Sequence, residues 1–478
     1  MRALVVVHRW LGIAFCLLFA MWFATGIVMH FVPYPNLTER ERVEGLAPIG
    51  SSTAVQDPAA ALAASAIHDA VRVRLVRRVD GLVYIVQGAS AVKAVNASDL
   101  SLAVLRSDRI ALAVAVEHAR RRGLDVSGAR LRELAAYDQW TVPNALDVHR
   151  PLYRINLNDA PRTEIYVSSI TGEVVRDTTR RERVWNYVGS VLHWIYPTVL
   201  RRNWGAWDAT VWTLSLIAAV TALAGGVLGV LRIRFERGRV ASPFHGWHAW
   251  HHWAGLITML FVLTWIVSGW LSMDHGRFFS TGQLRPDERA AFTGTGGLGS
   301  FPAGEIERIG TDAREIEWFA FGGKLYRREH IDFTAQRLSL AGEPVFQAQA
   351  QLSSGAVSTA ARRISAACGP AAAVLDADSY PVARSVPAAP VYRLECGEVW
   401  FQVDSADGRV LEKLDRSRRM YRWAYSALHT FDVPELTVRP KLRSALVVVL
   451  CALGFGFSVT AVVIGWRRLR QQLASGRP

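Results

Sequence analysis

The sequence predicts an integral membrane α-helical protein with four transmembrane helices, an internal duplication and two α+β domains outside the membrane. Hydrophobic residues make up 51% of the 478 residues, a high share for a soluble protein. Four apolar segments reach the roughly 20 residues that a helix needs to cross a bilayer. A long polar segment lies between the first and second of them, and another between the third and fourth. The spans are expected at about 5–32, 209–231, 253–273 and 445–466.

The first apolar segment is expected to be an uncleaved anchor rather than a signal peptide. Its apolar run is longer than the hydrophobic region of a signal peptide, typically about 7–15 residues. The residues that follow it, FVPYP at 31–35, also lack the small side chains of a cleavage site. The chain is therefore expected to have a membrane helix close to its N-terminus.

Arginines next to the spans predict the orientation of the chain, because short cytoplasmic segments are enriched in basic residues. They place both termini in the cytoplasm and the long segments, about 33–206 and 276–442, in a periplasm. The expected location is a bacterial inner (cytoplasmic) membrane, with the lipid bilayer as a partner. The net charge of +14 reflects arginine usage in part, and no nucleic-acid partner is inferred. The arginines that set the orientation are Arg232, Arg234, Arg237, Arg239, Arg467, Arg468 and Arg470.

Each long outer segment is expected to fold as a small α+β domain, because strand-like runs alternate with helical ones. Two cysteines of the second domain, Cys368 and Cys396, could form a disulfide in an oxidising compartment. The glycine-rich stretch 294–299 is expected to be a loop, since neither a strand before it nor a helix after it is evident. The first domain is expected to contain helices at 57–67 and 109–122 and strands at 71–79, 82–87, 91–95, 152–156 and 163–167, and the second a helix at 356–367 and strands at 391–395 and 399–403.

The two halves of the chain share a spacing of glycine turns and histidines. Gly172 precedes His193 by the same number of residues as Gly408 precedes His429. The segment HRWLG at 8–12 parallels HHWAG at 251–255, and Thr25-Gly26 parallels Ser268-Gly269. Glycines at matching positions allow helices, or a helix and a flat cofactor, to approach closely. These parallels predict the internal duplication.

The repeated histidines predict haem ligands, because a histidine within a membrane is a functional candidate by default and imidazole is the usual haem ligand in a helix bundle. His8 and His251 are expected to meet near the cytoplasmic surface, and His193 and His429 near the outer surface. Each pair would bind one haem iron, giving two haems of the b type. No other catalytic residue is predicted.

Several other residues are alternatives to these ligands. His252 or His248 could replace His251, and His30 and His275 are alternative outer ligands. Met29 and Met273 are expected to be packing or lipid-facing residues. Four further histidines are expected on the surface of the outer domains, namely His68, His118, His149 and His330.

Six parts follow from these observations. They are the first transmembrane helix at 1–35, an outer domain at 36–182, an interfacial helix with the second transmembrane helix at 183–235, a cytoplasmic loop with the third at 236–275, a second outer domain at 276–418, and an interfacial helix, the fourth transmembrane helix and a cytoplasmic tail at 419–478.

Six motifs resemble those of the PepSY-associated transmembrane helix family, which includes iron-regulated inner-membrane proteins and siderophore reductases. They are HRWLG at 8–12, FVPYP at 31–35, LHWIYP at 192–197, WHHWAGL at 250–256, TWIVSGWLSM at 264–273 and LHTFDVPEL at 428–436. The resemblance implies PepSY-like outer domains and a two-haem reductase that passes electrons outward to a ferric siderophore and releases Fe(II). It assigns His8, His193, His251 and His429 as haem ligands, whereas His30 and His275 lie outside the motifs.

Two other functions remain open at this point. A non-enzymatic PepSY protein could bind a peptide or regulate a protease, and it would contain no haem. A transporter could move iron or its chelate, although only four spans and no broken helix argue against this. Because no flavin or nicotinamide domain is evident, a reductase would need an electron donor such as a quinol or a cytoplasmic reductase.

Overall fold

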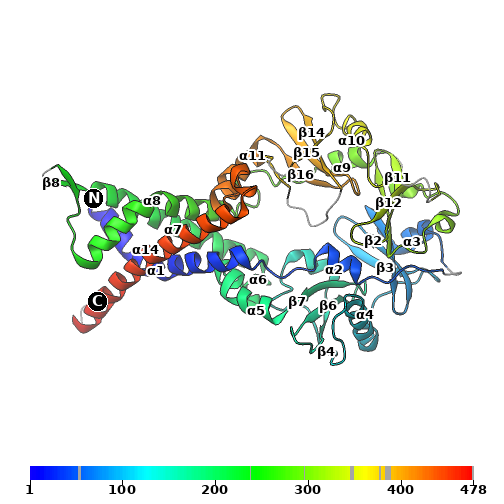
Figure 1. Ribbon diagram of the computed structural model, residues 1–478, viewed down its shortest axis with the longest axis horizontal. Helices are drawn as coiled ribbons and strands as arrows, with labels where there is room; N and C mark the ends of the chain where they lie inside the picture. The colour runs from blue at the N-terminus through cyan, green and yellow to red at the C-terminus, as the bar shows by residue number, and fades with distance from the viewer. Residues whose placement is uncertain are drawn as a thin grey trace.

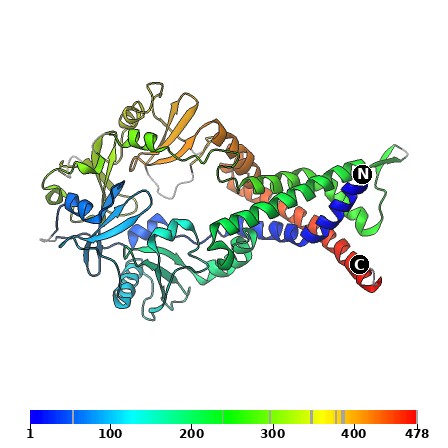
Figure 2. The same cartoon turned by 180° about the vertical axis from the view of Figure 1, so that it is seen from behind.

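A computed structural model describes residues 1–51, 55–236, 238–294, 297–344, 349–375, 378–382 and 389–475. Four long helices form a bundle, and most of the remaining elements form an arch at one end of it (Figures 1 and 2). Each long helix is apolar and long enough to cross a membrane, as predicted. They are α1 (Arg2–Phe31), α7 (Trp204–Leu231), α8 (Gly246–Leu271) and α14 (Pro440–Ser475).

The centre of the bundle is filled by large apolar side chains from three of these helices. Phe19 and Phe23 of α1 pack with Val262 and Trp265 of α8 and with Cys451 of α14. Both chain termini lie at the end of the bundle away from the arch, together with a hairpin of β8 (Arg234–Glu236) and β9 (Arg239–Ala241) (Figure 1). Arg237, one of the basic residues used to predict the orientation, lies outside the described residues.

The first outer segment contains the predicted helices and strands and several more. Its elements are α2 (Glu39–Glu44), α3 (Pro58–Ser65), β1 (Arg72–Arg78), β2 (Gly81–Gln87), β3 (Val92–Asn96), α4 (Asp108–Arg121), β4 (Arg130–Ala135), η1 (Asn144–His149), β5 (Leu152–Asn156), β6 (Glu164–Ser168), β7 (Val174–Thr178), α5 (Arg180–Asn186), η2 (Tyr187–Val191) and α6 (Thr198–Arg201). Side-chain oxygens of Thr38, Asp57, Ser107 and Thr179 cap the helices that follow them, which explains where these helices begin.

The second outer segment contains five strands that the sequence did not predict, namely β10 to β13 and β16. Its elements are α9 (Pro286–Thr293), η3 (Gly297–Gly299), η4 (Glu305–Arg308), β10 (Glu315–Phe321), β11 (Lys324–His330), β12 (Gln336–Leu340), α10 (Ser354–Ala361), β13 (Ala372–Ala373), β14 (Val391–Cys396), β15 (Val399–Asp404), β16 (Val410–Leu414), α11 (Arg416–Tyr421), η6 (Arg422–Ala427), α12 (Leu428–Thr430) and α13 (Pro434–Thr437). Thr295 and Gly296 of the predicted glycine-rich loop lie outside the described residues. Gly294 directly follows α9, and residues 297–299 form η3.

The two outer segments share a six-stranded sheet, which the sequence did not predict. Strand β1 pairs with β10 in an antiparallel register that places Arg74 opposite Glu317, and the strand order is β12-β11-β10-β1-β2-β3. This sheet lies at the end of the arch farthest from the bundle (Figure 1). A four-stranded sheet from each segment, β4-β5-β6-β7 and β13-β14-β15-β16, lies between it and the membrane helices.

In each four-stranded sheet, the turn between the last two strands contains a glycine that the sequence singled out. Gly172 and Gly408 both have left-handed backbone conformations, with φ of 70° and 71°. A Cβ at Gly172 would lie 2.7 Å from a guanidinium nitrogen of Arg78 in β1, and a Cβ at Gly408 would lie 2.5 Å from Phe321 in β10. Each turn therefore requires glycine for its backbone and for its close contact with the six-stranded sheet.

The elements that lead into the second and fourth membrane helices match residue for residue. The strand pairs β6–β7 and β15–β16 have irregularities at Tyr166/Val167 and at Gln402/Val403. Thr179 and Asp415 cap the helices that follow, and each helix continues into a π-helix, η2 or η6. The same spacing along the chain relates the irregularities, the capping residues, the last residues of η2 and η6, and the two glycine turns.

Ion pairs line one face of the six-stranded sheet where its two halves meet, and we call this group the charged seam. Arg42 and Arg74 bind Glu315 at 2.7 and 2.8 Å, and Arg328 binds Glu317 at 2.9 Å. Burial alone would raise the pKa of the Glu315 carboxyl, but Arg42 and Arg74 more than offset this and hold the pKa well below its usual range. The members of the seam are Arg42, Arg72, Arg74, Glu173, Glu315, Glu317, Arg328 and Asp407.

Replacing Glu315 by glutamine is expected to destabilise the outer assembly by about 3 kcal/mol, because two partly buried guanidinium groups would each lose one of their two carboxylate partners and keep only Glu39 or Glu173. Glu44→Gln is the matched control, since the Arg40–Glu44 pair is exposed and an exposed pair contributes less than about 1 kcal/mol. Urea unfolding of the detergent-purified chain, followed by the fluorescence of tryptophans such as the buried Trp318, would compare the two. Equal stability of the two variants would contradict the account of the seam.

Two histidines that were predicted on the surface are buried. His118 is 5% exposed and His330 is 3% exposed, whereas His149 is half-buried and His68 is exposed as predicted. His118 packs beneath the chain at Gly45, where a Cβ would overlap its ring, and His330 lies beside Glu315 of the seam. The prediction was wrong for these two because tertiary packing, not local sequence, covers them.

The outer assembly is expected to lose stability as the pH falls from about 6.5. Burial, together with the charge of Arg122, lowers the pKa of His118 to about 3, and burial together with the charge of Arg328 lowers the pKa of His330 to about 4. Because the unfolded chain binds these protons near pH 6.5 and the folded chain does not, stability declines by roughly 3 kcal/mol per histidine as the pH falls towards 4.

Thermal unfolding between pH 7 and about pH 5 tests this expectation, since carboxylates such as Glu315 titrate below that range. Asp177, whose pKa burial raises to about 6, titrates within it but acts in the opposite direction and cannot cause a loss of stability as the pH falls. Replacing both His118 and His330 by glutamine should flatten the dependence, and replacing the exposed His68 should leave it unchanged. A dependence that persists in the double variant would contradict the assignment.

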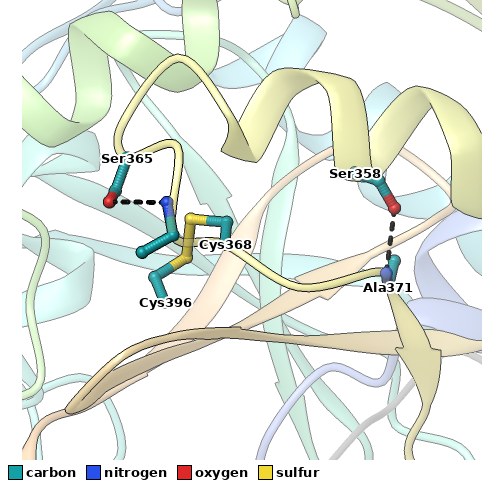
Figure 3. The surroundings of a disulfide bond; sticks show 6 residues. Ser358, Ser365, Cys368, Ala371 and Cys396 are labelled. Carbon is teal, nitrogen blue, oxygen red and sulfur yellow. Dashed lines mark hydrogen bonds between the residues drawn. A yellow bond between two sulfur atoms is a disulfide. The ribbon is translucent and has the colours of Figure 1, made fainter.

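A disulfide bond joins Cys368 and Cys396, the pair that the sequence suggested (Figure 3). It links the loop after α10 to the end of β14, and the two backbones also form an isolated β-bridge there. The loop is held further by the Ala371 amide, which donates to the Ser358 hydroxyl at 2.9 Å. The two remaining cysteines, Cys16 and Cys451, are free and buried in the bundle.

Candidate functional site

Two pairs of histidines lie within the helix bundle. His8 of α1 and His251 of α8 have ring centres 6.4 Å apart. His193, directly after η2, and His429 of α12 also have ring centres 6.4 Å apart. The structure thus brings together both pairs that the sequence suggested, each with one histidine from either half of the chain.

The two pairs are far apart along the bundle. His193 contacts α1 at Thr25 and Gly26, whereas His8 lies near the start of the same helix. With a rise of about 1.5 Å per residue, these levels of α1 are roughly 25 Å apart. We refer to His193 and His429, which lie toward the arch, as the outer pair, and to His8 and His251, at the opposite end of the bundle, as the inner pair.

Each of the four imidazoles is oriented through Nδ1. In the outer pair, Nδ1 of His193 shares a hydrogen bond with the Thr25 hydroxyl at 3.0 Å, and Nδ1 of His429 with the Ser268 hydroxyl at 3.1 Å. In the inner pair, Nδ1 of His251 shares one with the Thr460 hydroxyl at 2.9 Å, and Nδ1 of His8 lies 3.3 Å from the Thr221 carbonyl. Among the described residues, Nε2 of these four histidines forms no hydrogen bond, so it is available to a ligand.

Glycines give the imidazoles room on the neighbouring helices. A Cβ at Gly225 of α7 would lie 2.6 Å from Cε1 of His8, and one at Gly269 of α8 would lie 3.1 Å from Cε1 of His429. Gly26 is similarly close to His193, at 3.7 Å. Of the other glycines that the sequence highlighted, Gly255 faces Phe457, and a Cβ at Gly12 would meet nothing within 4 Å.

The outer histidines follow two backbone features that the sequence analysis missed. The π-helices η2 and η6 each insert an extra residue per turn directly before His193 and His429. Two residues after each histidine, Ile195 and Phe431 adopt left-handed conformations with φ of 50° and 51°. A left-handed isoleucine is costly, and such strain is typical of positions that the surrounding structure must hold. The matching Leu-His motifs were the only sequence signal.

The alternative ligands are engaged elsewhere. His252 uses both ring nitrogens, with the Ser242 hydroxyl at 2.8 Å and the Gly229 carbonyl at 2.9 Å. His30 binds Ser444 at 2.8 Å through Nε2, and Nε2 of His275 lies 3.2 Å from Asp208. His248 is exposed at the start of α8. None of these residues joins either pair.

Aromatic side chains lie near the outer pair. The indole of Trp22 donates to the carbonyl of His193 at 2.9 Å, and Trp265 packs on Phe431 and Phe23. Met273 is buried against Trp207 as a packing residue, as expected. Within the described part of the chain, no group of three or more histidine, cysteine, aspartate or glutamate side chains could hold a bare metal ion.

The chain was compared with known proteins on this basis. No curated protein matches it. One family, described as the PepSY-associated TM region, matches residues 5–468 and therefore nearly the whole chain, including all four histidines of the two pairs. The resemblance that the six motifs suggested is thereby confirmed, and the chain belongs to the PepSY-associated TM region family.

Proposed function

We propose that this chain is a bacterial inner-membrane haem protein that carries electrons across the membrane and reduces a ferric siderophore on the outer side. The observation that carries the proposal is the pair of histidine sites at two levels of one bundle. Both have the same ring separation, and all four imidazoles are oriented through Nδ1 with Nε2 unused. Regulatory or peptide-binding functions give no reason for such sites.

Both pairs fit a haem iron with two axial imidazoles. Two imidazoles on opposite sides of one metal, each about 2 Å from it, have ring centres on the order of 6 Å apart. Histidine ligands commonly share their second nitrogen with a protein group that fixes the ring, as Thr25, Ser268, Thr460 and the Thr221 carbonyl do here. Haem iron held by His8 with His251, and by His193 with His429, would supply a one-electron carrier near each membrane surface.

The orientation and origin of the chain belong to the same proposal. The disulfide Cys368–Cys396 supports a periplasmic location for the arch, because disulfides persist in oxidising compartments. Arg467 and Arg468 at the far end of α14 support cytoplasmic termini. The matched bulges, caps, π-helices and histidines support an internal duplication with a pseudo-twofold axis between its halves.

Reduction is a sufficient means of releasing the iron. The hard oxygen donors of a siderophore bind Fe(III) far more tightly than Fe(II), so one electron lowers the affinity without a proton-transfer residue. The apolar side chains around the pairs exclude water, and the histidines hold the site in place. The electron donor is proposed to be a quinol or a cytoplasmic reductase. The unbroken helices α1, α7, α8 and α14 give no support to a transport path.

Proteoliposomes test the proposed function. The chain is reconstituted with dithionite trapped inside and a ferric siderophore with an Fe(II)-specific dye outside. We expect Fe(II) to appear outside with the native chain and to fall to the level of empty liposomes with a His8→Ala/His429→Ala variant. The exposed His248→Ala variant is the matched control and should retain the native rate. Equal rates for the native chain and the double variant would contradict the proposal and favour a peptide-binding or regulatory function.

A further inference from the structure

We propose that the second outer half carries a binding surface for a ferric chelate that is both anionic and aromatic, the chemistry of a tris-catecholate. This inference rests on the proposed function and names its substrate class. The surface lies between the second four-stranded sheet and η6, the π-helix that leads to His429. We call it the arginine–aromatic surface, and its residues are Tyr380, Arg393, Trp400, Arg419, Arg422 and Trp423.

Three aromatic rings form the framework of this surface. The ring of Tyr380 lies perpendicular to that of Trp400, with centres 5.4 Å apart, and 6.3 Å from that of Trp423. The indole of Trp423 donates to the Tyr380 hydroxyl at 3.2 Å, which fixes the two rings relative to each other. Trp423 is 40% exposed, so part of the framework can reach a ligand.

The arginines of the surface carry charge that nearby acids do not fully offset. Arg393 is paired with Asp378 at 2.7 Å. The guanidinium of Arg419 instead lies 4.4 Å from the centre of the Trp400 ring, and no acidic side chain among the described residues pairs with it. Arg422 is only 8% exposed. Its Nη2 lies 3.7 Å from the Asp432 carboxylate and donates to the Asp432 carbonyl, whereas its Nε and Nη1 have no hydrogen-bond partner within the described structure. A buried guanidinium with free donors is costly unless an anion completes it.

The corresponding place in the first half has the opposite chemistry. Glu164 stands where Trp400 stands in the second half, since Glu164 pairs with Thr178 and Trp400 with Leu414 in matching strand registers. Arg183, which corresponds to Arg419, lies 3.6 Å from Glu164, and Arg154 binds the same carboxylate at 2.9 Å. The first half thus neutralises Arg183, whereas the second replaces the acid by an aromatic ring and leaves Arg419 without a carboxylate partner among the described residues.

A guanidinium group without a carboxylate partner, such as that of Arg419, together with neighbouring aromatic rings selects for ligands that are anionic and planar. Arginine donates to oxyanions and stacks on rings, and aromatic side chains contribute further stacking. A ferric tris-catecholate has a net negative charge and exposed aromatic rings, whereas a ferric tris-hydroxamate is neutral around the metal and lacks them. The surface therefore favours the first class.

The position of the surface suits the proposed reaction. Arg422 and Trp423 begin η6, whose Tyr425 has its ring 5.6 Å from that of His429. A chelate bound at the arginine–aromatic surface would therefore lie close to the outer pair, and η6 would separate the two.

Binding of gallium(III) chelates tests the inference without any redox step, because Ga(III) has the charge and size of Fe(III) but is not reduced. Calorimetry with the full detergent-purified chain would compare a gallium tris-catecholate with a gallium tris-hydroxamate. We expect the catecholate complex to bind more tightly and its affinity to fall with rising salt. Arg419→Gln should weaken it about tenfold, the effect of losing one charged hydrogen-bond partner. Arg419→Lys keeps the charge, so it should lose less affinity than Arg419→Gln. Binding by this variant would also show that the position tolerates replacement.

Arg183→Gln is the matched control, since it alters the corresponding arginine of the first half and should leave catecholate binding unchanged. Equal affinity for the two gallium complexes, no binding of either, or equal effects of Arg419→Gln and Arg183→Gln would overturn the inference. Because the measurement involves no electron transfer, specific catecholate binding would support this surface even if the proteoliposome experiment ruled out reduction.

Discussion

Replacing His429 by alanine is expected to remove one of about two haems and to leave the other in place. The outer pair would lose an axial ligand, whereas His8 and His251 lie roughly 25 Å away along α1 and share no contact with it. His8→Ala should remove the inner haem instead, and the two changes together should give a colourless protein. Haem content per chain, measured as the pyridine haemochrome, reports each result.

His252→Ala and His30→Ala are the matched controls for these variants. Both residues are histidines of the bundle ends, but their contacts with Ser242, Gly229 and Ser444 mark them as structural. Each variant should therefore keep the full haem content. Loss of a haem in His252→Ala with retention in His251→Ala would show that the wrong neighbour has been assigned to the inner pair.

Replacing Gly225 by valine is expected to abolish the inner haem while sparing the outer one. Even the Cβ of the new side chain would lie 2.6 Å from Cε1 of His8, so the imidazole would have to turn away from His251. Nearly all of the inner haem should be lost, since a histidine displaced by more than about 1 Å cannot reach its metal.

Gly12→Val is the control for this change, because a Cβ at Gly12 would meet nothing within 4 Å. The same substitution in the same bundle should thus have opposite outcomes at the two positions. Spectra that retain both haems in Gly225→Val would contradict the placement of His8 against α7.

Much of this architecture could be predicted from the sequence because its signals are local. The four spans follow from apolar runs, and the histidine pairs follow from equal spacings in the two halves. The hairpin of β5 and β6 follows from alternation and turn residues. Even the hydroxyls that orient the outer pair were visible, since Thr25 and Ser268 precede the matching glycines Gly26 and Gly269.

The parts of the fold that could not be predicted depend on contacts between distant segments. Strands β10 and β11 bury the charged side chains of Glu315, Glu317 and Arg328. Their counter-charges come in part from Arg72 and Arg74 of the distant strand β1, a pairing that local sequence does not indicate. The joined sheet was therefore missed.

The contacts of the inner pair could not be predicted from the sequence either. Neither the carbonyl of Thr221 nor the gap at Gly225 could be assigned to His8 from spacing, because α7 contacts α1 only through tertiary packing. The two π-helices likewise have no distinct local sequence signal.

The central claim is that the bundle holds two haems between histidine pairs, and an absorption spectrum of the detergent-purified chain tests it most directly. Oxidised and dithionite-reduced spectra should show a low-spin b-type haem, with about two haems per chain by pyridine haemochrome. A chain that is colourless after purification from haem-replete cells would contradict the claim and would leave the two histidine pairs as structural elements of the membrane helices.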